Sequence, residues 1–230
     1  MSVREENDEE GKALKVADRI ADIRSNFDGR QNDAVDAILD DCLAGGNDFV
    51  FPIVDGPPGT GKTTVGTVAV AEYLEQTAEA QVLYMCYTHF AAAQAKQTLE
   101  EKLGLPPQKV VKLTHETHKK DWQKGIVGCR PDLSDLSDDE TRRLKQCPVL
   151  LCTLHGSKRA LEARGTKCRV IVDEFSQVDP AMFFSTISKL KAHNPSGYAL
   201  LGDPKQLPVV NTQPLLSSNI VSYLGARSSI

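Results

Sequence analysis

Residues 56–63 read Gly56-Pro57-Pro58-Gly59-Thr60-Gly61-Lys62-Thr63, and this stretch decides the fold. An apolar run at residues 49–54 precedes it, and the chain then continues without a breaker until Gly66. A strand, a glycine-rich loop and a helix start form the context in which G-x-x-x-x-G-K-[ST] predicts a phosphate-binding loop. Glycines let backbone N–H groups turn toward an anion, and a helix N-terminus adds partial positive charge. Because every fixed position is filled, a chance glycine-rich turn is the weaker interpretation.

The side chains of this loop predict how a nucleotide would be held. We expect Lys62 to reach the terminal phosphates and the Thr63 hydroxyl to ligate a Mg²⁺ ion that the nucleotide carries. The predicted nucleotide-binding residues of the loop are Gly56, Pro57, Pro58, Gly59, Thr60, Gly61, Lys62, Thr63 and Thr64.

Composition places the chain among ordinary soluble proteins. Its 230 residues are 40% apolar and 25% charged, enough for one large domain or two small ones. No apolar run approaches the roughly 20 residues that span a bilayer, and the N-terminus lacks the apolar core of a signal peptide. The six cysteines follow no C-x-x-C spacing, so we expect reduced thiols. We predict no membrane partner and a cytoplasmic location, or a nuclear one in a eukaryote.

The net charge of −4 is unevenly distributed. Residues 1–10 hold five acids and one arginine, and residues 132–140 hold five acids and no base. Outside these two segments, the chain has 21 of its 31 acidic residues and 26 of its 27 basic residues. A mildly basic body of this kind is compatible with a nucleic-acid partner.

Short apolar runs alternate with helical patterns along the chain. Strands are predicted near residues 49–54, 81–87, 109–113, 148–153, 168–173 and 198–201. Helices are predicted at residues 12–25, 63–76, 90–103, 179–192 and 214–224, with another from Asp28 to about residue 43. This alternation predicts an α/β fold with a largely parallel sheet and helices on both faces. Ligands of such sheets bind at the carboxyl ends of the strands.

The same patterns give a domain organisation. Residues 1–11 are expected to be an acidic disordered tail, and residues 12–230 to form one nucleotide-binding domain. Residues 114–147 show no strong period, so we interpret them as an insertion with one or two helices.

A pair of carboxylates follows the apolar run Val170-Ile171-Val172, in the segment Asp173-Glu174-Phe175-Ser176-Gln177. Asp173 at this strand end can hold Mg²⁺ opposite Thr63, and Glu174 can orient and deprotonate the attacking water. Such a pair alone is typical of a solvated turn. Beside a complete phosphate-binding loop, it predicts the second half of one site.

Two glutamines are further candidates. Gln206, in the segment Gly202-Asp203-Pro204-Lys205-Gln206-Leu207-Pro208, can reach the terminal phosphate or the attacking water, although the segment alone indicates only a polar turn. Gln31 can hydrogen-bond N6 and N7 of adenine, but a lone helical glutamine is as often a surface residue.

Taken together, Gln31, the loop at residues 56–63 and the segments 173–177 and 202–208 resemble motifs Q, I, II and III of the superfamily 1 DNA and RNA helicases. The resemblance is closest to the branch of RNA-surveillance and replication helicases, whose motif II is commonly Asp-Glu-Ala-x-Gln. Phe175 stands where that branch has alanine. From about Asn26 to Leu224, the resemblance implies a RecA-like P-loop NTPase fold that binds ATP and Mg²⁺.

Three further segments, at residues 82–93, 109–115 and 150–157, resemble motifs Ia, Ib and Ic of that family. These motifs contact the backbone of single strands in family members. The resemblance therefore implies single-stranded DNA or RNA as a partner, with contacts from Thr88, His89 and Thr153. His89 stands where asparagine is frequent, which weakens the assignment at that position.

The resemblance covers only the first of the two RecA-like domains of such helicases. In the family, a second domain supplies arginines that complete the ATP site, and such an arginine contributes on the order of 10³–10⁵ in rate in related hydrolases. We therefore expect an ATP-dependent helicase domain that binds ATP but hydrolyses it slowly until a second domain or partner chain is supplied. The alternative is a stand-alone nucleotide-binding regulatory module without unwinding activity. Another P-loop ATPase or a small-molecule kinase is a third interpretation, and a kinase leaves residues 202–208 without a role.

Overall fold

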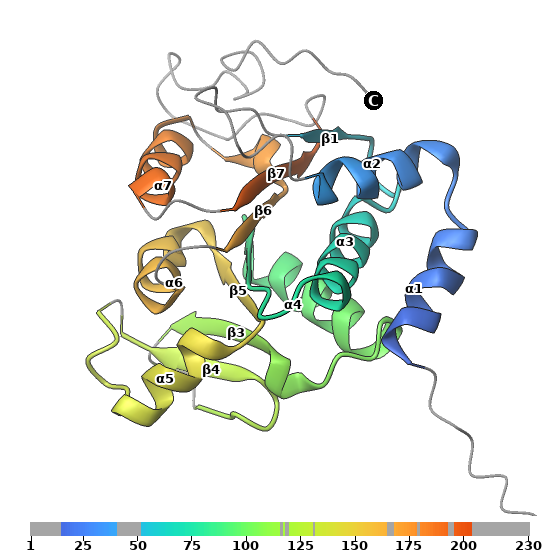
Figure 1. The fold of residues 1–230 in the computed structure, drawn as a ribbon. Helices are drawn as coiled ribbons and strands as arrows, with labels where there is room; N and C mark the ends of the chain where they lie inside the picture. The colour runs from blue at the N-terminus through green and yellow to red at the C-terminus, as the bar shows by residue number, and fades with distance from the viewer. Residues whose placement is uncertain are drawn as a thin grey trace, which may run out of the picture.

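The computed structural model describes residues 15–40, 52–115, 117, 120–130, 132–164, 168–178, 180–192 and 196–203. Strands and helices alternate along this part of the chain (Figure 1). The strands are β1 (Ile53–Asp55), β2 (Val82–Cys86), β3 (Val110–His115), β4 (Ile126–Cys129), β5 (Val149–Thr153), β6 (Arg169–Asp173) and β7 (Gly197–Gly202). The helices are α1 (Val16–Ser25), α2 (Gly29–Leu39), α3 (Lys62–Gln76), α4 (His89–Gln97), α5 (Asp138–Gln146), α6 (Ser157–Arg164) and α7 (Pro180–Ala192).

Within these residues, the strands form a seven-stranded sheet in the order β1-β7-β6-β2-β5-β3-β4. Every strand pair is parallel, and β6 lies between β2 and β7, where Val172 pairs with Met85 on one side and Leu200 on the other. Parallel neighbours require crossover connections, and helices supply them except between β3 and β4, which follow each other directly in the order of the described elements. The predicted α/β fold, a parallel RecA-like sheet of the P-loop type, is confirmed.

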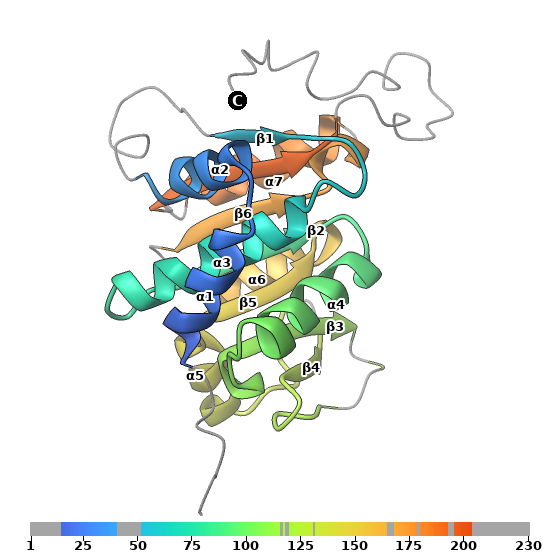
Figure 2. The ribbon, with the colours of Figure 1, turned by 90° about the vertical axis from the view of Figure 1, so that its right-hand side faces the viewer.

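Helices cover both faces of the sheet, as predicted. Figures 1 and 2 show α1 to α4 on one face and α5 to α7 on the other. Successive side chains of a strand point to opposite faces. Tyr84 of β2 therefore packs with α3 and α4, whereas Leu83 and Met85 join the cluster under α5 to α7. None of the described helices has both the length and the apolar character needed to cross a membrane.

The element boundaries differ from the predicted ones in small ways. Helix α3 begins at Lys62, one residue earlier than expected. Helix α2 ends at Leu39 instead of near residue 43, because Asp40 has an extended backbone with ψ of 116°. The regular part of α4 ends at Gln97 and continues as a π-helical turn, Thr98–Lys102. The predicted tail at residues 1–11 and the predicted helix at residues 214–224 lie outside the described residues.

The stretch 114–147, interpreted above as an insertion with one or two helices, contains a helix and also contributes a strand to the main sheet. Strand β4 pairs with β3, with Lys112 opposite Ile126, and helix α5 follows it. Its four residues include Gly128, and they are too few for an alternating or apolar run to be recognised. The sequence analysis therefore missed this strand.

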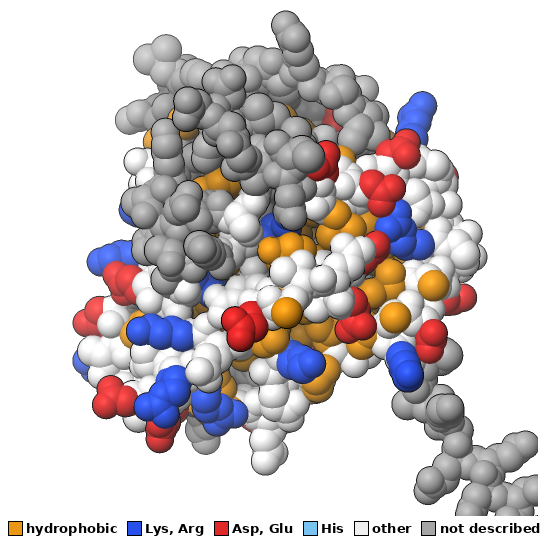
Figure 3. Space-filling model, viewed as in Figure 1, with side chains coloured by type: hydrophobic (Ala, Val, Ile, Leu, Met, Phe, Trp, Pro, Cys, Tyr) orange, Lys and Arg blue, Asp and Glu red, His pale blue; other side chains and the backbone are white. Residues whose placement is uncertain are grey.

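The acidic residues 132–140 are part of the folded body. Glu140 pairs with Lys120 at 3.2 Å, and Asp139 pairs with Arg142 at 2.9 Å. Figure 3 shows acidic and basic side chains side by side around α5. The Ser137 backbone N–H lowers the pKa of Glu140 to about 2, aided by Trp122 and Lys120. Lys120 and Arg142 of the body pair with Glu140 and Asp139. Leaving the acidic segment out of the charge count therefore overstated the basic character of the body.

Gly125, just before β4, packs closely against the segment at the start of β3. Its φ is +59°, and a Cβ atom there would lie 2.3 Å from the Pro107 carbonyl oxygen and 2.5 Å from that of Val110. We expect Gly125→Ala to lower the free energy of unfolding by about 2–4 kcal/mol, because backbone strain adds to overpacking. Denaturant unfolding measures the loss. Gly29→Ala is the matched control, since a Cβ atom at Gly29 meets nothing within 4 Å; equal stability of the two variants would contradict the prediction.

Candidate active site

The glycine-rich loop joins the carboxyl end of β1 to the first turn of α3. Gly59 and Gly61 both have φ of +82°, a left-handed conformation that side chains disfavour. Gly61 also takes the N-cap position of α3, and a Cβ atom there would lie 3.2 Å from the Gln31 side-chain nitrogen. The predicted glycines are thus required by the backbone path that turns the loop into the helix.

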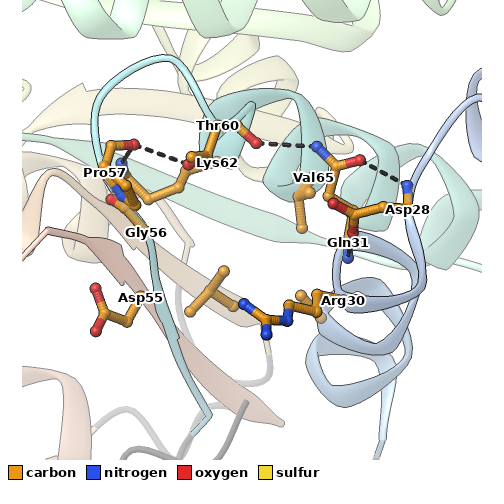
Figure 4. A pocket seen from close by; sticks show the side chains of 11 residues that line it. Asp28, Arg30, Gln31, Asp55, Gly56, Pro57, Thr60, Lys62 and Val65 are labelled. Carbon is orange, nitrogen blue, oxygen red and sulfur yellow. Dashed lines mark hydrogen bonds between the residues drawn. The ribbon is translucent and has the colours of Figure 1, made fainter.

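Lys62 lies across this loop. Its ammonium group donates to the carbonyl oxygens of Gly56 and Pro57, the latter at 2.9 Å, and Thr60 Oγ1 donates to the Pro57 carbonyl at 2.8 Å. These contacts hold the loop closed upon itself, as Figure 4 shows. A lysine has three donors, so the same group can exchange its carbonyl contacts for an anion at the loop.

Gln31 lies at the rim of the loop, and its contacts brace the loop. Its Nε2 donates to the Thr60 carbonyl at 2.9 Å, and its Oε1 accepts the Asp28 N–H at 2.9 Å in a capping box of α2 (Figure 4). One amide hydrogen and one lone pair remain for a ligand. The role at adenine stays a prediction.

A cleft of about 180 Å³ opens between α2 and the loop. Asp28, Arg30, Gln31 and Ala34 line it from α2 and its cap, and Val54, Asp55, Gly56, Pro57, Thr60, Lys62 and Val65 line it from β1, the loop and α3. Gly59, Gly61 and Thr64 line a second hollow of about 350 Å³ beside Asn26 and Phe27, and Gln31 and Thr60 line both cavities. The loop therefore borders two open spaces.

The structure brings Thr63 and Asp173 together across 110 positions of sequence. Thr63 Oγ1 donates to Asp173 Oδ2 at 2.9 Å, and the Glu174 N–H donates to Asp173 Oδ1 at 2.9 Å. Asp173 is 1% exposed at the end of β6. Burial raises the pKa of this carboxyl, although the Thr63, Tyr84 and Glu174 donors oppose the rise.

Tyr84 is a member of this site that the sequence analysis missed. Its side chain is fully buried in β2, and its hydroxyl donates to Asp173 Oδ2 at 2.9 Å. Burial, and then the charge of Asp173, raises the pKa of Tyr84 well above its ordinary value, so the hydroxyl stays protonated and acts as a donor. A tyrosine inside an apolar run gives no signal of this contact before the strands are placed.

Glu174 has an unusual backbone and an unpartnered oxygen. Its φ of 56° and ψ of 34° are left-handed, so the chain turns sharply just after β6. Among the described residues, no group hydrogen-bonds its buried Oε2 atom. Burial, and then the charge of Asp173, raises the pKa of Glu174, while Lys62 opposes the rise. A half-buried carboxylate with an unused oxygen is suited to accept a proton.

Gln206 lies outside the described residues. Only the first two residues of its segment, Gly202 and Asp203, are described. The Asp203 N–H donates to Ser176 Oγ at 3.2 Å, and a Cβ atom at Gly202 would lie 2.6 Å from the buried Phe175 ring. Phe175, the departure from the family pattern, therefore fills space that the glycine leaves open.

The three predicted strand-contact residues lie at the carboxyl edge of the sheet. Thr88 caps α4 by accepting the Ala91 N–H at 3.0 Å, and His89 is exposed beside it. Thr153, at the end of neighbouring β5, is only 8% exposed, which leaves little of its side chain open to a ligand. Phe90 was not singled out from the sequence, yet it is 72% exposed next to His89.

Trp122 has flanking lysines that suit base stacking, although anchoring is the stronger interpretation of the sequence, and its contacts in the structure are those of an anchor. Its Nε1 donates to Glu140 at 3.2 Å, and the Arg143 guanidinium lies 4.5 Å from the ring centroid. These contacts join the loop before β4 to helix α5.

Several solved helicase structures have a similar fold. The chain is similar to the Hef helicase domain of Pyrococcus furiosus, with a TM-score of 0.57 and 15% identity over 90% of this chain and 38% of that one. It is also similar to UvsW of bacteriophage T4, with a TM-score of 0.54 and 17% identity over 93% of this chain and 38% of that one. A third similar structure is the DUF1998 helicase MrfA bound to DNA and AMPPNP, with a TM-score of 0.50 and 15% identity over 80% of this chain and 26% of that one. The chain thus spans well under half the length of these proteins.

Sequence comparison gives the family. No curated protein matches the chain. A family profile described as AAA domain matches residues 49–212, which include the glycine-rich loop and both carboxylates. This match covers more than half of the chain and agrees with the helicase-like P-loop fold, and the protein therefore belongs to the AAA domain family.

Proposed function

We propose that the chain is the ATP-binding and ATP-hydrolysing first motor domain of a superfamily 1 helicase or translocase. The observation that carries the proposal is the hydrogen bond of 2.9 Å between Thr63 Oγ1 and Asp173 Oδ2. It joins the phosphate-binding loop to the carboxylate segment at one point. The DNA-bound state of the similar protein MrfA agrees with a nucleic-acid partner.

This separation suits a shared Mg²⁺ ion. Magnesium takes octahedral oxygen ligands at about 2.0–2.1 Å, which places adjacent ligands about 2.9 Å apart. Thr63 and Asp173 would hold the ion together with the nucleotide. The ion, when bound, neutralises charge on the β- and γ-phosphates. Asp173 suits this role because a buried carboxylate prefers to be paired with a cation.

The chain's own groups divide the remaining work. Lys62 would move from the loop carbonyls to the terminal phosphates, and Gln31 would use its remaining donor and acceptor on adenine. Glu174 would orient the attacking water and accept its proton. Gln206 is proposed to contact the terminal phosphate or that water.

We further propose that a second RecA-like domain, on the same polypeptide or on a partner chain, completes the site. An arginine from that domain would stabilise the transition state, worth on the order of 10³–10⁵ in rate. The similar solved chains, of which this chain spans 38% or less in the three cases above, are long enough to hold such a domain.

A single strand of DNA or RNA is proposed to cross the carboxyl edge of the sheet over Thr88, His89 and Thr153. Phe90 is the residue that we expect to contribute most there, because an exposed aromatic ring can stack on a base of any sequence. Its exposure of 72% leaves the ring open at the start of α4.

Phe90→Ala should weaken single-strand binding about 5- to 150-fold, since base stacking on an aromatic residue is worth about 1–3 kcal/mol. Fluorescence anisotropy with labelled oligo(dT) and oligo(U) measures the change. Phe184→Ala is the matched control, because Phe184 is 47% exposed but lies on α7, on the other face of the sheet. If both variants bind as tightly as the wild type, Phe90 is not a strand contact.

The decisive experiment is ATP hydrolysis by the chain with its second domain supplied, with and without single strands. Stimulation by strands is expected. ATP binding without stimulation would favour the alternative of a nucleotide-binding regulatory module. Absence of ATP binding would overturn the proposal.

A further inference from the structure

Tyr84 contacts the candidate metal-binding carboxylate from within the core. Its hydroxyl donates to Asp173 Oδ2 at 2.9 Å, and Thr63 Oγ1 donates to the same oxygen at 2.9 Å. The Glu174 N–H occupies the other oxygen, Oδ1. Of these three donors, Tyr84 alone lies outside the loop and the carboxylate segment. It comes from β2, which pairs with β6 beside it.

The surrounding packing leaves space for this hydroxyl. A Cβ atom at Gly66 of α3 would lie 3.0 Å from the Tyr84 hydroxyl and 2.5 Å from Leu201 Cδ1, so the helix passes directly over the tyrosine. An aliphatic side chain would fill the core at residue 84 without any polar group. A buried hydroxyl needs a partner, and the partner here is Asp173.

We propose that Tyr84 is a positioning residue, which holds Asp173 in the orientation at which Asp173 and Thr63 share one Mg²⁺ ion. The inference rests on the function proposed above. Thr63 is itself a proposed ligand of the ion, whereas the fully buried Tyr84 stays behind the carboxylate. Groups that hydrogen-bond metal ligands orient them, and their loss typically costs about 10–100-fold in metal affinity.

The test is the Mg²⁺ dependence of ATP binding by the full chain. A fluorescent ATP analogue is titrated in EDTA and then at increasing Mg²⁺ concentrations, for the wild type and for Tyr84→Phe. We expect unchanged affinity in EDTA and a Mg²⁺ midpoint raised about 10–100-fold. Tyr73→Phe is the matched control, because the Tyr73 hydroxyl lies 3.5 Å from Ser196 Oγ and not beside Asp173. The Mg²⁺ midpoint of this variant should equal that of the wild type.

A double-mutant cycle tests the route through Asp173. In an Asp173→Asn background, Tyr84→Phe should cause no further change in the Mg²⁺ midpoint, because coupled residues are not additive. An unchanged midpoint in Tyr84→Phe, an additive effect in the double variant, or an equal loss of affinity in EDTA would each overturn the inference while leaving the proposed function intact. A wild type whose ATP binding ignores Mg²⁺ would overturn both.

Discussion

Glu174→Gln should lower ATP turnover about 10²–10⁴-fold and leave ATP affinity almost unchanged, because general-base catalysis contributes that much to rate and little to binding. Glutamine has nearly the same shape but cannot take a proton from water. The backbone N–H that orients Asp173 belongs to residue 174 whichever side chain it carries. The substitution therefore removes the unpartnered carboxylate oxygen and leaves the neighbouring contacts in place.

The measurement is steady-state ATPase with the second domain and single strands supplied, alongside nucleotide binding by titration. Glu79→Gln is a close control, since Glu79 also has a left-handed backbone, with φ of 57°, but lies in the turn between α3 and β2. Glu79→Gln should hydrolyse ATP at the wild-type rate. Full turnover in Glu174→Gln would show that another group accepts the proton.

The sequence was sufficient to predict the fold and the proximity of Thr63 and Asp173 at the edge of the sheet. The apolar runs that form β2, β5 and β6 could be recognised as buried strands without any tertiary contact. Strands connected by helices point in the same direction, so polar segments at their ends meet at one edge. On this basis Thr63 was expected to lie near Asp173, and the Thr63 Oγ1 and Asp173 Oδ2 atoms are 2.9 Å apart in the structure.

Groups that depend on tertiary packing could not be predicted. Tyr84 belongs to a fully buried apolar strand, and its role follows from the pairing of β2 with β6 and from the close approach of α3 at Gly66. Likewise, the left-handed backbone at Glu174 could not be predicted, because residue 174 is neither glycine nor asparagine, the residue types that usually indicate this conformation. These features arise where the fold imposes an orientation that the residue type does not prefer.

The outer part of the chain shows a second limit. Strand β4 is four residues long and was missed, because its pairing with β3 comes from its position at the sheet edge. Two of the acids at residues 132–140, Glu140 and Asp139, form pairs with Lys120 and Arg142, which a count of charges along the sequence cannot show. Charge patterns indicate a solvated face more securely than they indicate a partner.

Lys62→Ala should weaken ATP and ADP binding about 100-fold or more, because a hydrogen bond to a charged group is worth about 1.5–3 kcal/mol and the ammonium group can make more than one. The structure adds a second consequence. Lys62 also binds the carbonyls of Gly56 and Pro57, so its loss removes one of the contacts that brace the loop. Two other braces remain, from Thr60 Oγ1 to the Pro57 carbonyl and from Gln31 to the Thr60 carbonyl.

Adenosine separates these two effects, because it has no phosphates. If Lys62 acts on phosphates, Lys62→Ala should bind adenosine as the wild type does while losing ATP and ADP. If the loop collapses instead, adenosine affinity should fall as well. Lys158→Ala, at an exposed lysine of α6, controls for the removal of a positive charge. Equal ATP affinity of Lys62→Ala and the wild type would contradict the assignment of this loop to phosphate binding, since no other group of the loop carries a positive charge.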